Sequence, residues 1–173
     1  MKKSYLIFIT FILLSSCNSI VKTIYDDTTA RYNAYFIANE EIKNIEEDYE
    51  KNLNQGFDSL IDLTYKIDTN QVSSIQERTQ NSIEKLSILI QRQTTSKYVY
   101  PSYALIGKSR VLNLNLKEAI TTLKYVNSKS NNNEANTMAL VYLLRAYTEN
   151  KDYNSAQDCL LYTSPSPRDV CSS

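Results

Sequence analysis

Residues 103–114, YALIGKSRVLNL, decide the fold expected of this chain. Counted from Tyr103, six residues of this stretch stand at i, i+3, i+4, i+7, i+8 and i+11, and residues at this spacing share one face of an α-helix. The polar residues 113–117, NLNLK, follow as a short turn. The stretch therefore predicts one helix that ends in a turn. The residues on its recurrent face are Tyr103, Ile106, Gly107, Arg110, Val111 and Leu114.

The surrounding sequence repeats at a constant spacing. Ser82, Ala119 and Ala156 lie 37 residues apart, and apolar residues follow the first two at i+4 and i+7. A small residue followed by such apolar residues marks a helix face that a neighbouring helix can approach closely. Each unit therefore reads as helix, short polar turn, helix, with a second turn at 148–153. The other residues expected to pack within these units are Leu86, Leu123, Leu140, Leu143 and Tyr147, together with Tyr103, Ile106 and Gly107.

These units resemble tetratricopeptide repeats, in which helix A carries apolar, small and Tyr positions and helix B carries small and apolar ones. The sequence departs from that pattern at Arg110, where Tyr is usual, at Val126, where Ala is usual, and at Leu144, where a small residue is usual. The resemblance implies an all-α fold of stacked tetratricopeptide-like hairpins, an α-solenoid, over residues 81–158. An unrelated array of helical hairpins is the open alternative.

The region before the repeats, residues 28–80, is predicted to be a helical extension. A first helix is expected to begin at Thr28 or Thr29 as N-cap and to end before Gly56, a natural residue after a helix C-terminus. Residues 71–93 then read as one long helix. The successive acids Glu46, Glu47 and Asp48 point in different directions on a helix, so we interpret them as a solvated face.

The N-terminus, MKKSYLIFITFILLSSC, has the pattern of a secretory signal. Two lysines precede an apolar run of about ten residues, which is too short to span a bilayer that needs ~20 helical residues. Leu, two Ser and Cys17 resemble a bacterial lipobox, which implies that Cys17 is acylated after removal of residues 1–16. Residues 17–27 are expected to be a linker between this anchor and the helices. An ordinary signal peptide with an incidental Cys is the alternative.

The C-terminal stretch differs in composition from the rest of the chain. Residues 159–169, CLLYTSPSPRD, resemble the translation of a transposon-based sequencing-library adapter in one reading frame. We therefore expect residues 159–173 to be non-native, to pack against nothing, and to replace a continuation of the protein after Asp158. A native Pro-rich tail is the alternative.

Composition excludes several classes of function. The chain has equal numbers of basic and acidic residues, 19 each, so it lacks the basic surplus of a nucleic-acid binder. It has no His, and its glycines are isolated, so neither a catalytic triad, a His-based metal site nor a phosphate-binding loop is predicted. We therefore expect no enzyme activity, no cofactor and no small-molecule substrate.

The order of these parts resembles a family. A lipobox, then RYNAYFIANEEIK at 31–43, then the helices described above are similar to the N-terminal region of the tetratricopeptide-repeat lipoproteins of type IX secretion and gliding motility (SprE/PorW type). Ala38 departs from the Gly usual in that motif. The resemblance implies a longer protein that is lipid-anchored in the outer membrane, faces the periplasm and binds protein partners of a secretion machine. The motif residues present are Tyr32, Asn33, Tyr35, Phe36, Asn39 and Glu40.

Two other lipoprotein classes remain as alternatives. A lipoprotein helper of outer-membrane β-barrel assembly also joins a lipobox to tetratricopeptide units, although its repeats usually begin sooner after the lipid. A glycan-capture lipoprotein normally carries Trp-rich loops, and this chain has no Trp.

The resemblance also predicts where a partner binds. In tetratricopeptide arrays, helix A residues between the packing positions line the concave surface. Lys108 and Arg145 occupy the same position 37 residues apart, so they are expected to lie side by side as cations for a carboxylate-bearing segment. Two solvated cations are the alternative. The other residues predicted to line this surface are Ala104, Val111, Leu112, Val141 and Thr148.

Overall fold

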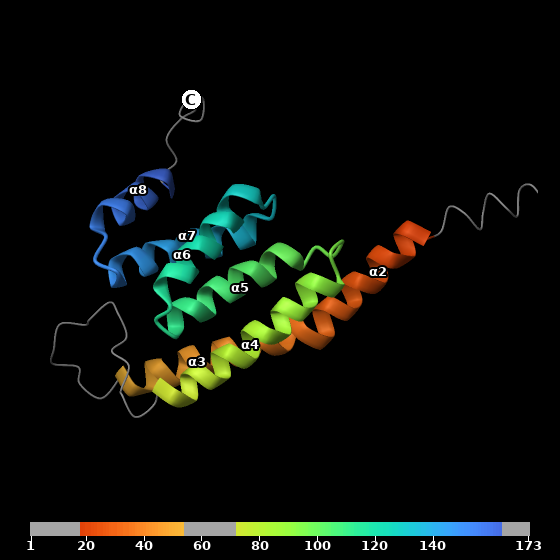
Figure 1. Cartoon of the computed structure of the whole chain (residues 1–173), viewed down its shortest axis with the longest axis horizontal. Helices are drawn as coiled ribbons and strands as arrows, with labels where there is room; N and C mark the ends of the chain where they lie inside the picture. Colours follow the sequence, from red (N-terminus) through yellow and green to blue (C-terminus); the bar gives the residue numbers. More distant parts are fainter. Residues whose placement is uncertain (1–17, 54–71, 164–173) are drawn as a thin grey trace, which may run out of the picture.

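The computed structural model describes residues 18–53 and 72–163 (Figure 1). Over these residues every regular element is helical, so the all-α prediction is confirmed there. Cys17, Gly56 and the residues from 164 onward lie outside the described part. The elements are α2 (Asn18–Ala30), the π-helical turn η1 (Arg31–Tyr35), α3 (Phe36–Leu53), α4 (Val72–Arg92), α5 (Val99–Leu112), α6 (Leu116–Lys129), α7 (Asn133–Glu149) and α8 (Tyr153–Thr163).

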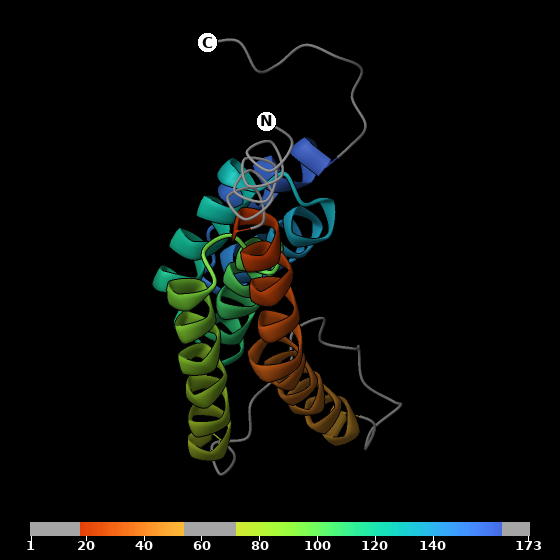
Figure 2. The same ribbon diagram turned by 90° about the vertical axis from the view of Figure 1, so that its right-hand side faces the viewer.

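Each helix from α3 to α8 packs against the next one in the chain, and α5 also packs against α7. The helices α2, η1 and α3 form one long helical segment that runs beside α4, while α6, α7 and α8 lie on the other side of α5 (Figures 1 and 2). The predicted long helix over 71–93 matches α4 within a residue at each end. The chain is therefore a series of helices with α5 in the middle.

The core is divided between the two sides of α5. One cluster joins α3 and α4 to α5 through Ile42, Ile45 and Leu86, and the other joins α5 to α6, α7 and α8. Because α5 contributes to both clusters, it is buried on both faces and carries few polar side chains. Of the residues predicted to pack within the repeats, Tyr103 and Leu140 are half-buried. The others are buried: Ser82, Leu86, Ile106, Gly107, Ala119, Leu123, Leu143, Tyr147 and Ala156.

Gly107 is the point of closest approach between α5 and α6. A Cβ atom added to it would lie 2.4 Å from Cδ2 and 2.5 Å from Cγ of Leu123, which is fully buried in α6. Two carbon atoms at van der Waals contact are about 3.5–4.0 Å apart, so no side chain fits between these helices as they stand. Arg110, one turn later, uses its guanidinium to reach Thr122 and Glu118 of α6.

The turns after α5 and α7 have the same backbone structure, 37 residues apart. Leu114 and Lys151 both have positive φ, 62° and 58°. The following residues, Asn115 and Asp152, each donate their backbone N–H to a carbonyl five residues back, at 2.8 and 2.9 Å. This left-handed residue followed by a six-to-one hydrogen bond is the Schellman ending of a helix.

The N-terminal helix begins earlier than predicted. Helix α2 begins at Asn18, so the prediction of a linker over 17–27 is wrong for its described part. Residues 18–30 contain neither Gly nor Pro, and nothing in them interrupts helical hydrogen bonding. Thr28 lies inside the helix, where its hydroxyl donates to the carbonyl of Ile24 at 2.8 Å, and is not an N-cap.

The beginning of the C-terminal stretch also differs from its prediction. Helix α8 continues to Thr163, and Cys159 is half-buried against the core cluster of α5 to α8. The expectation that residues 159–173 pack against nothing is therefore wrong for Cys159. The physical reason is helical register, because Cys159 follows buried Ala156 by three residues and so faces the same side. Leu160 and Leu161 are exposed.

Candidate partner-binding surface

The predicted cationic position at Lys108 is covered by the chain's own helix α3. The Lys108 ammonium lies 2.6 Å from a carboxylate oxygen of Glu46, and its side chain is only 13% exposed. The phenol of Tyr142 in α7 donates a hydrogen bond to the other oxygen of Glu46. Lys108 also lies 5.1 Å from the centre of the Tyr142 ring. The carboxylate expected from a partner is thus supplied by α3.

Three residues expected on the same surface are in the core. Ala104, Val111 and Leu112 have relative exposures of 0%, 1% and 1%. The prediction that they line an exposed surface is wrong, because α3 and α4 cover one side of α5 while α6 and α7 cover the other. The spacing of residues along one helix cannot reveal this burial. It identifies a face of the helix but does not show whether other helices pack on that face.

The residues predicted on α7 have mixed surroundings. The Arg145 side chain is 20% exposed, with its guanidinium 4.0 Å from Glu149 of the same helix. The hydroxyl of Thr148 donates to carbonyls of its own helix. Val141 is exposed, at 57%. Lys108 and Arg145 therefore each have an acidic neighbour within the chain and do not form a pair of cations open to a partner.

Helix α3 is held in place by ion pairs as well as by its apolar face. Arg78 of α4 contacts Glu41 at 2.5 Å and Asp48 at 2.9 Å. Together with Glu46 bound to Lys108, these contacts place acidic residues of α3 against α4 and α5. The interpretation of a solvated face is therefore wrong for Glu46, whose side chain is 21% exposed, whereas Glu47 and Asp48 are exposed as predicted.

A second surface carries a pocket rich in tyrosine. Three rings form its aromatic wall: Tyr125 of α6 lies 5.1 Å from Tyr103 and 6.4 Å from Tyr100, both of α5, measured between ring centroids. The pocket has a volume of about 580 Å³ and lies between α2, the loop after α4, α5 and α6. We call it the tyrosine pocket. Its remaining lining residues are Thr23, Asp27, Ile90, Thr94, Thr95, Ser96, Lys97 and Val99.

The tyrosine pocket combines rings with polar groups at one edge. Burial, and then the neighbouring Tyr125 and Tyr100, raise the pKa of Tyr103. Lys97 lies 3.9 Å from Asp27 at the rim and is well exposed. Tyrosines with an apolar body and a polar tip are enriched where proteins bind proteins. Sequence reasoning missed this site, although the 14 tyrosines of the chain were a signal for it.

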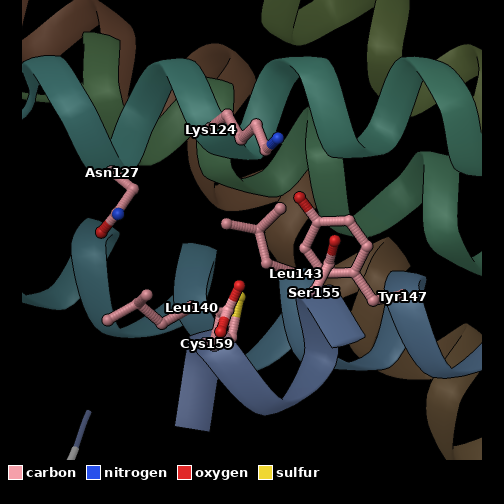
Figure 3. A pocket seen from close by; sticks show the side chains of 8 residues that line it. Lys124, Asn127, Leu140, Leu143, Tyr147, Ser155 and Cys159 are labelled. Carbon is pink, nitrogen blue, oxygen red and sulfur yellow. The ribbon is translucent and has the colours of Figure 1, made fainter. Parts of the chain in front are cut away.

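A smaller pocket of about 280 Å³ lies between α6, α7 and α8 (Figure 3). In Figure 3 Lys124 of α6 extends toward the phenol of Tyr147, and the interaction of its ammonium with this phenol raises the pKa of Lys124. Burial raises the pKa of the Cys159 thiol, which keeps it protonated and poorly nucleophilic. The other residues lining this pocket are Asn127, Leu140, Leu143, Ser155 and Asp158.

Within residues 18–53 and 72–163 no group of three or more Cys, Asp or Glu residues is placed to hold a metal ion. In the same ranges no helix is long and apolar enough to cross a bilayer. Comparisons with protein families, with curated proteins and with solved structures give no match to this chain.

Proposed function

We propose that this chain is the membrane-anchored part of a helical-repeat scaffold that binds protein partners. The observation that carries the proposal is the pair of matching Schellman turns at Leu114 and Lys151, each joining two helices that pack against one another. Identical turns at a fixed spacing are what a repeated helix–turn–helix unit produces. We infer from this that α5–α6 and α7–α8 are tetratricopeptide-like units of an α-solenoid, with α3–α4 as a longer preceding hairpin.

The tyrosine pocket supports partner binding better than the position of Lys108 and Arg145. Its rings stand between two helices of one unit and the loop before it, and Tyr125 is 43% exposed. Aromatic residues at such positions contribute much of the binding free energy in protein interfaces. The proposed partner is a protein segment that inserts an apolar side chain among these rings.

The cellular assignment rests on the sequence. The lipobox at Cys17 and the motif at 31–43 support a lipoprotein of the outer membrane, facing the periplasm, in the type IX secretion and gliding machinery. In the native host, deletion of the complete gene should abolish secretion of type IX cargo and leave outer-membrane β-barrel proteins at normal levels. We expect the wild-type gene to restore secretion and the Cys17→Ala gene not to restore it. The Cys17→Ala protein should also no longer incorporate a palmitate analogue. A loss of β-barrel proteins instead would assign the chain to barrel assembly.

The binding surface is tested in the same strain. Tyr125→Ala should reduce secretion and co-purification of the machinery's membrane components by at least fivefold, because it removes the central ring of the pocket. Tyr153→Ala is the matched control, since Tyr153 is 65% exposed on α8 and lies outside the pocket. Equal behaviour of the two variants would rule out the tyrosine pocket as the partner site.

A further inference from the structure

Helix α2 exposes an apolar face that no other part of the described chain covers. Ile20, Val21, Ile24 and Tyr25 have relative exposures of 64%, 55%, 61% and 67%. At about 100° per residue these positions lie on one side of the helix. Tyr32 in η1 and Phe36 at the start of α3 are also exposed, at 61% and 56%. Contiguous exposed apolar surface of this kind marks a contact site.

The acidic residues of α2 face the protein. Asp26 is 4% exposed and accepts a hydrogen bond from the hydroxyl of Thr95 at 2.7 Å. Asp27 accepts from the hydroxyl of Ser96 and from the backbone N–H of Lys97, both at 2.9 Å. The loop after α4 therefore takes up both carboxylates. The charges that α2 and η1 leave exposed are basic, on Lys22 and Arg31.

The π-helical turn η1 also has one side that faces the protein and one side that faces outward. Tyr35 packs on Tyr98 with ring centroids 5.0 Å apart, and burial, then the charge of Glu134, raises its pKa to about 12. Tyr32, three residues earlier, points outward with the Arg31 guanidinium 5.4 Å from its ring centre. One side of the α2–η1 segment thus binds the protein, while the other is apolar, aromatic and basic.

The position of α2 in the chain limits what this face can meet. The helix begins at Asn18, the residue directly after Cys17, so no linker separates it from the proposed acyl chains. At 1.5 Å per residue, Tyr25 is about 10 Å along the axis from the start of the helix at Asn18. In Figure 1, α2 lies at one end of the molecule, far from α8.

We propose that α2 lies in the plane of the membrane surface, with its apolar face among the lipid headgroups and acyl chains. This inference rests on the lipid anchor of the proposed function. An interfacial helix needs an apolar face, basic rather than acidic exposed charge, and aromatic residues at the boundary between lipid and water, and α2 with η1 has all three. The membrane contact would orient the scaffold, because Asp26, Asp27 and Tyr35 hold the opposite side of α2 and η1 against the loop after α4.

The test uses fluorescence quenching by brominated lipids. Residues 1–173 contain no Trp, so a single substitution gives this part of the protein its only indole, and any Trp in the continuation after Asp158 is replaced by Phe. The complete mature protein carrying Tyr25→Trp, with its acyl chains, is reconstituted in phosphatidylethanolamine–phosphatidylglycerol vesicles with or without brominated acyl chains. We expect bromine to reduce its emission at least twofold. Tyr153→Trp, equally exposed on α8, is the control and should lose less than a tenth of its emission.

Two further samples separate this inference from the anchor. Ile20→Ser with Ile24→Ser, added to Tyr25→Trp, should abolish quenching while palmitate labelling of Cys17 remains. If brominated lipids do not quench the emission of the acylated Tyr25→Trp protein, the inference is overturned and the anchor stands. This holds whether α2 is free in solution or covered by another protein. Quenching in Cys17→Ala protein at high lipid concentration, together with absent palmitate labelling of the wild type, supports the interfacial helix and overturns the anchor.

Discussion

At Gly107, α5 and α6 approach closely because glycine has no side chain. Leu123 is fully buried and its Cγ lies 2.5 Å from where a Cβ would stand, so a rotation of its terminal methyl groups alone does not make room. Either the two helices separate or Leu123 leaves its rotamer, and both reduce packing around it. The glycine of the repeat pattern is therefore explained by one identified contact.

Gly107→Ala should lower the free energy of unfolding by roughly 1–2 kcal/mol, because a clash this short costs toward the upper end of the ~1–3 kcal/mol of core overpacking and the helix propensity of Ala offsets part of it. Ala has the higher helix propensity by about 1 kcal/mol, so the net loss comes from steric conflict alone. Urea unfolding followed by circular dichroism measures it. In a double-mutant cycle, the cost should be smaller in a Leu123→Ala background. An Ala variant as stable as the wild type would mean that the helices are not this close.

At the scale of elements, the turns after α5 and α7 place a non-glycine residue in a left-handed conformation. A left-handed residue other than Gly costs roughly 1–2 kcal/mol, whereas Gly adopts it freely. Both turns nevertheless keep the Schellman hydrogen bonds, at Asn115 and Asp152. The side chain of Asp152 also accepts a hydrogen bond from the backbone N–H of Ser155 at 3.2 Å, so the same residue closes one helix and caps the next.

Lys151→Gly should raise the free energy of unfolding by about 0.5–1 kcal/mol, because Gly adopts a positive φ without strain. This gain exceeds the cost of the greater conformational entropy of Gly in the unfolded chain. Leu114→Gly should act in the same direction. The matched control is Asn150→Gly, since Asn150 is exposed and has φ of −78°, and it should destabilise by a similar amount. Thermal unfolding of the three variants measures this. Destabilisation by Lys151→Gly equal to that of the control would contradict the turn geometry.

At the scale of the whole molecule, α3 joins parts of the chain that are far apart in sequence. Glu46 binds Lys108 of α5 and Tyr142 of α7, and the side chains of Glu46 and Lys108 are only 21% and 13% exposed. Arg78 ties α3 to α4 at two further carboxylates. The hairpin α3–α4 and the helices α5–α8 are therefore one packed body, in which α3 occupies a surface that α5–α8 alone would expose.

Glu46→Gln should lower the free energy of unfolding by about 1–2 kcal/mol, because it leaves the Lys108 ammonium largely buried without a counter-charge. Glu47→Gln changes the neighbouring, exposed residue and should stay within about 0.5 kcal/mol of the wild type. Hydrogen exchange should show faster opening of α3 in the Glu46→Gln protein, with α8 unchanged. Indistinguishable unfolding of the two variants would mean that Glu46 is merely solvated.

The sequence by itself determined the helical class, the bounds of α4 to within a residue, and which small and apolar residues pack in the core, because helical spacing is a local property of neighbouring residues. Helix α5, however, begins at Val99, four residues before the predicted stretch. The sequence did not determine what covers each helix. Val111, Leu112 and Lys108 satisfied the pattern of an exposed surface, yet α3, α4 and α6 pack there, because burial on a second face depends on contacts between distant segments. The tyrosine pocket arose in the same way, since Tyr100, Tyr103 and Tyr125 meet only when α5 and α6 close on each other at Gly107. Likewise, the apolar residues of α2 became a distinct face only when the loop after α4 took up Asp26 and Asp27 through hydrogen bonds across the fold.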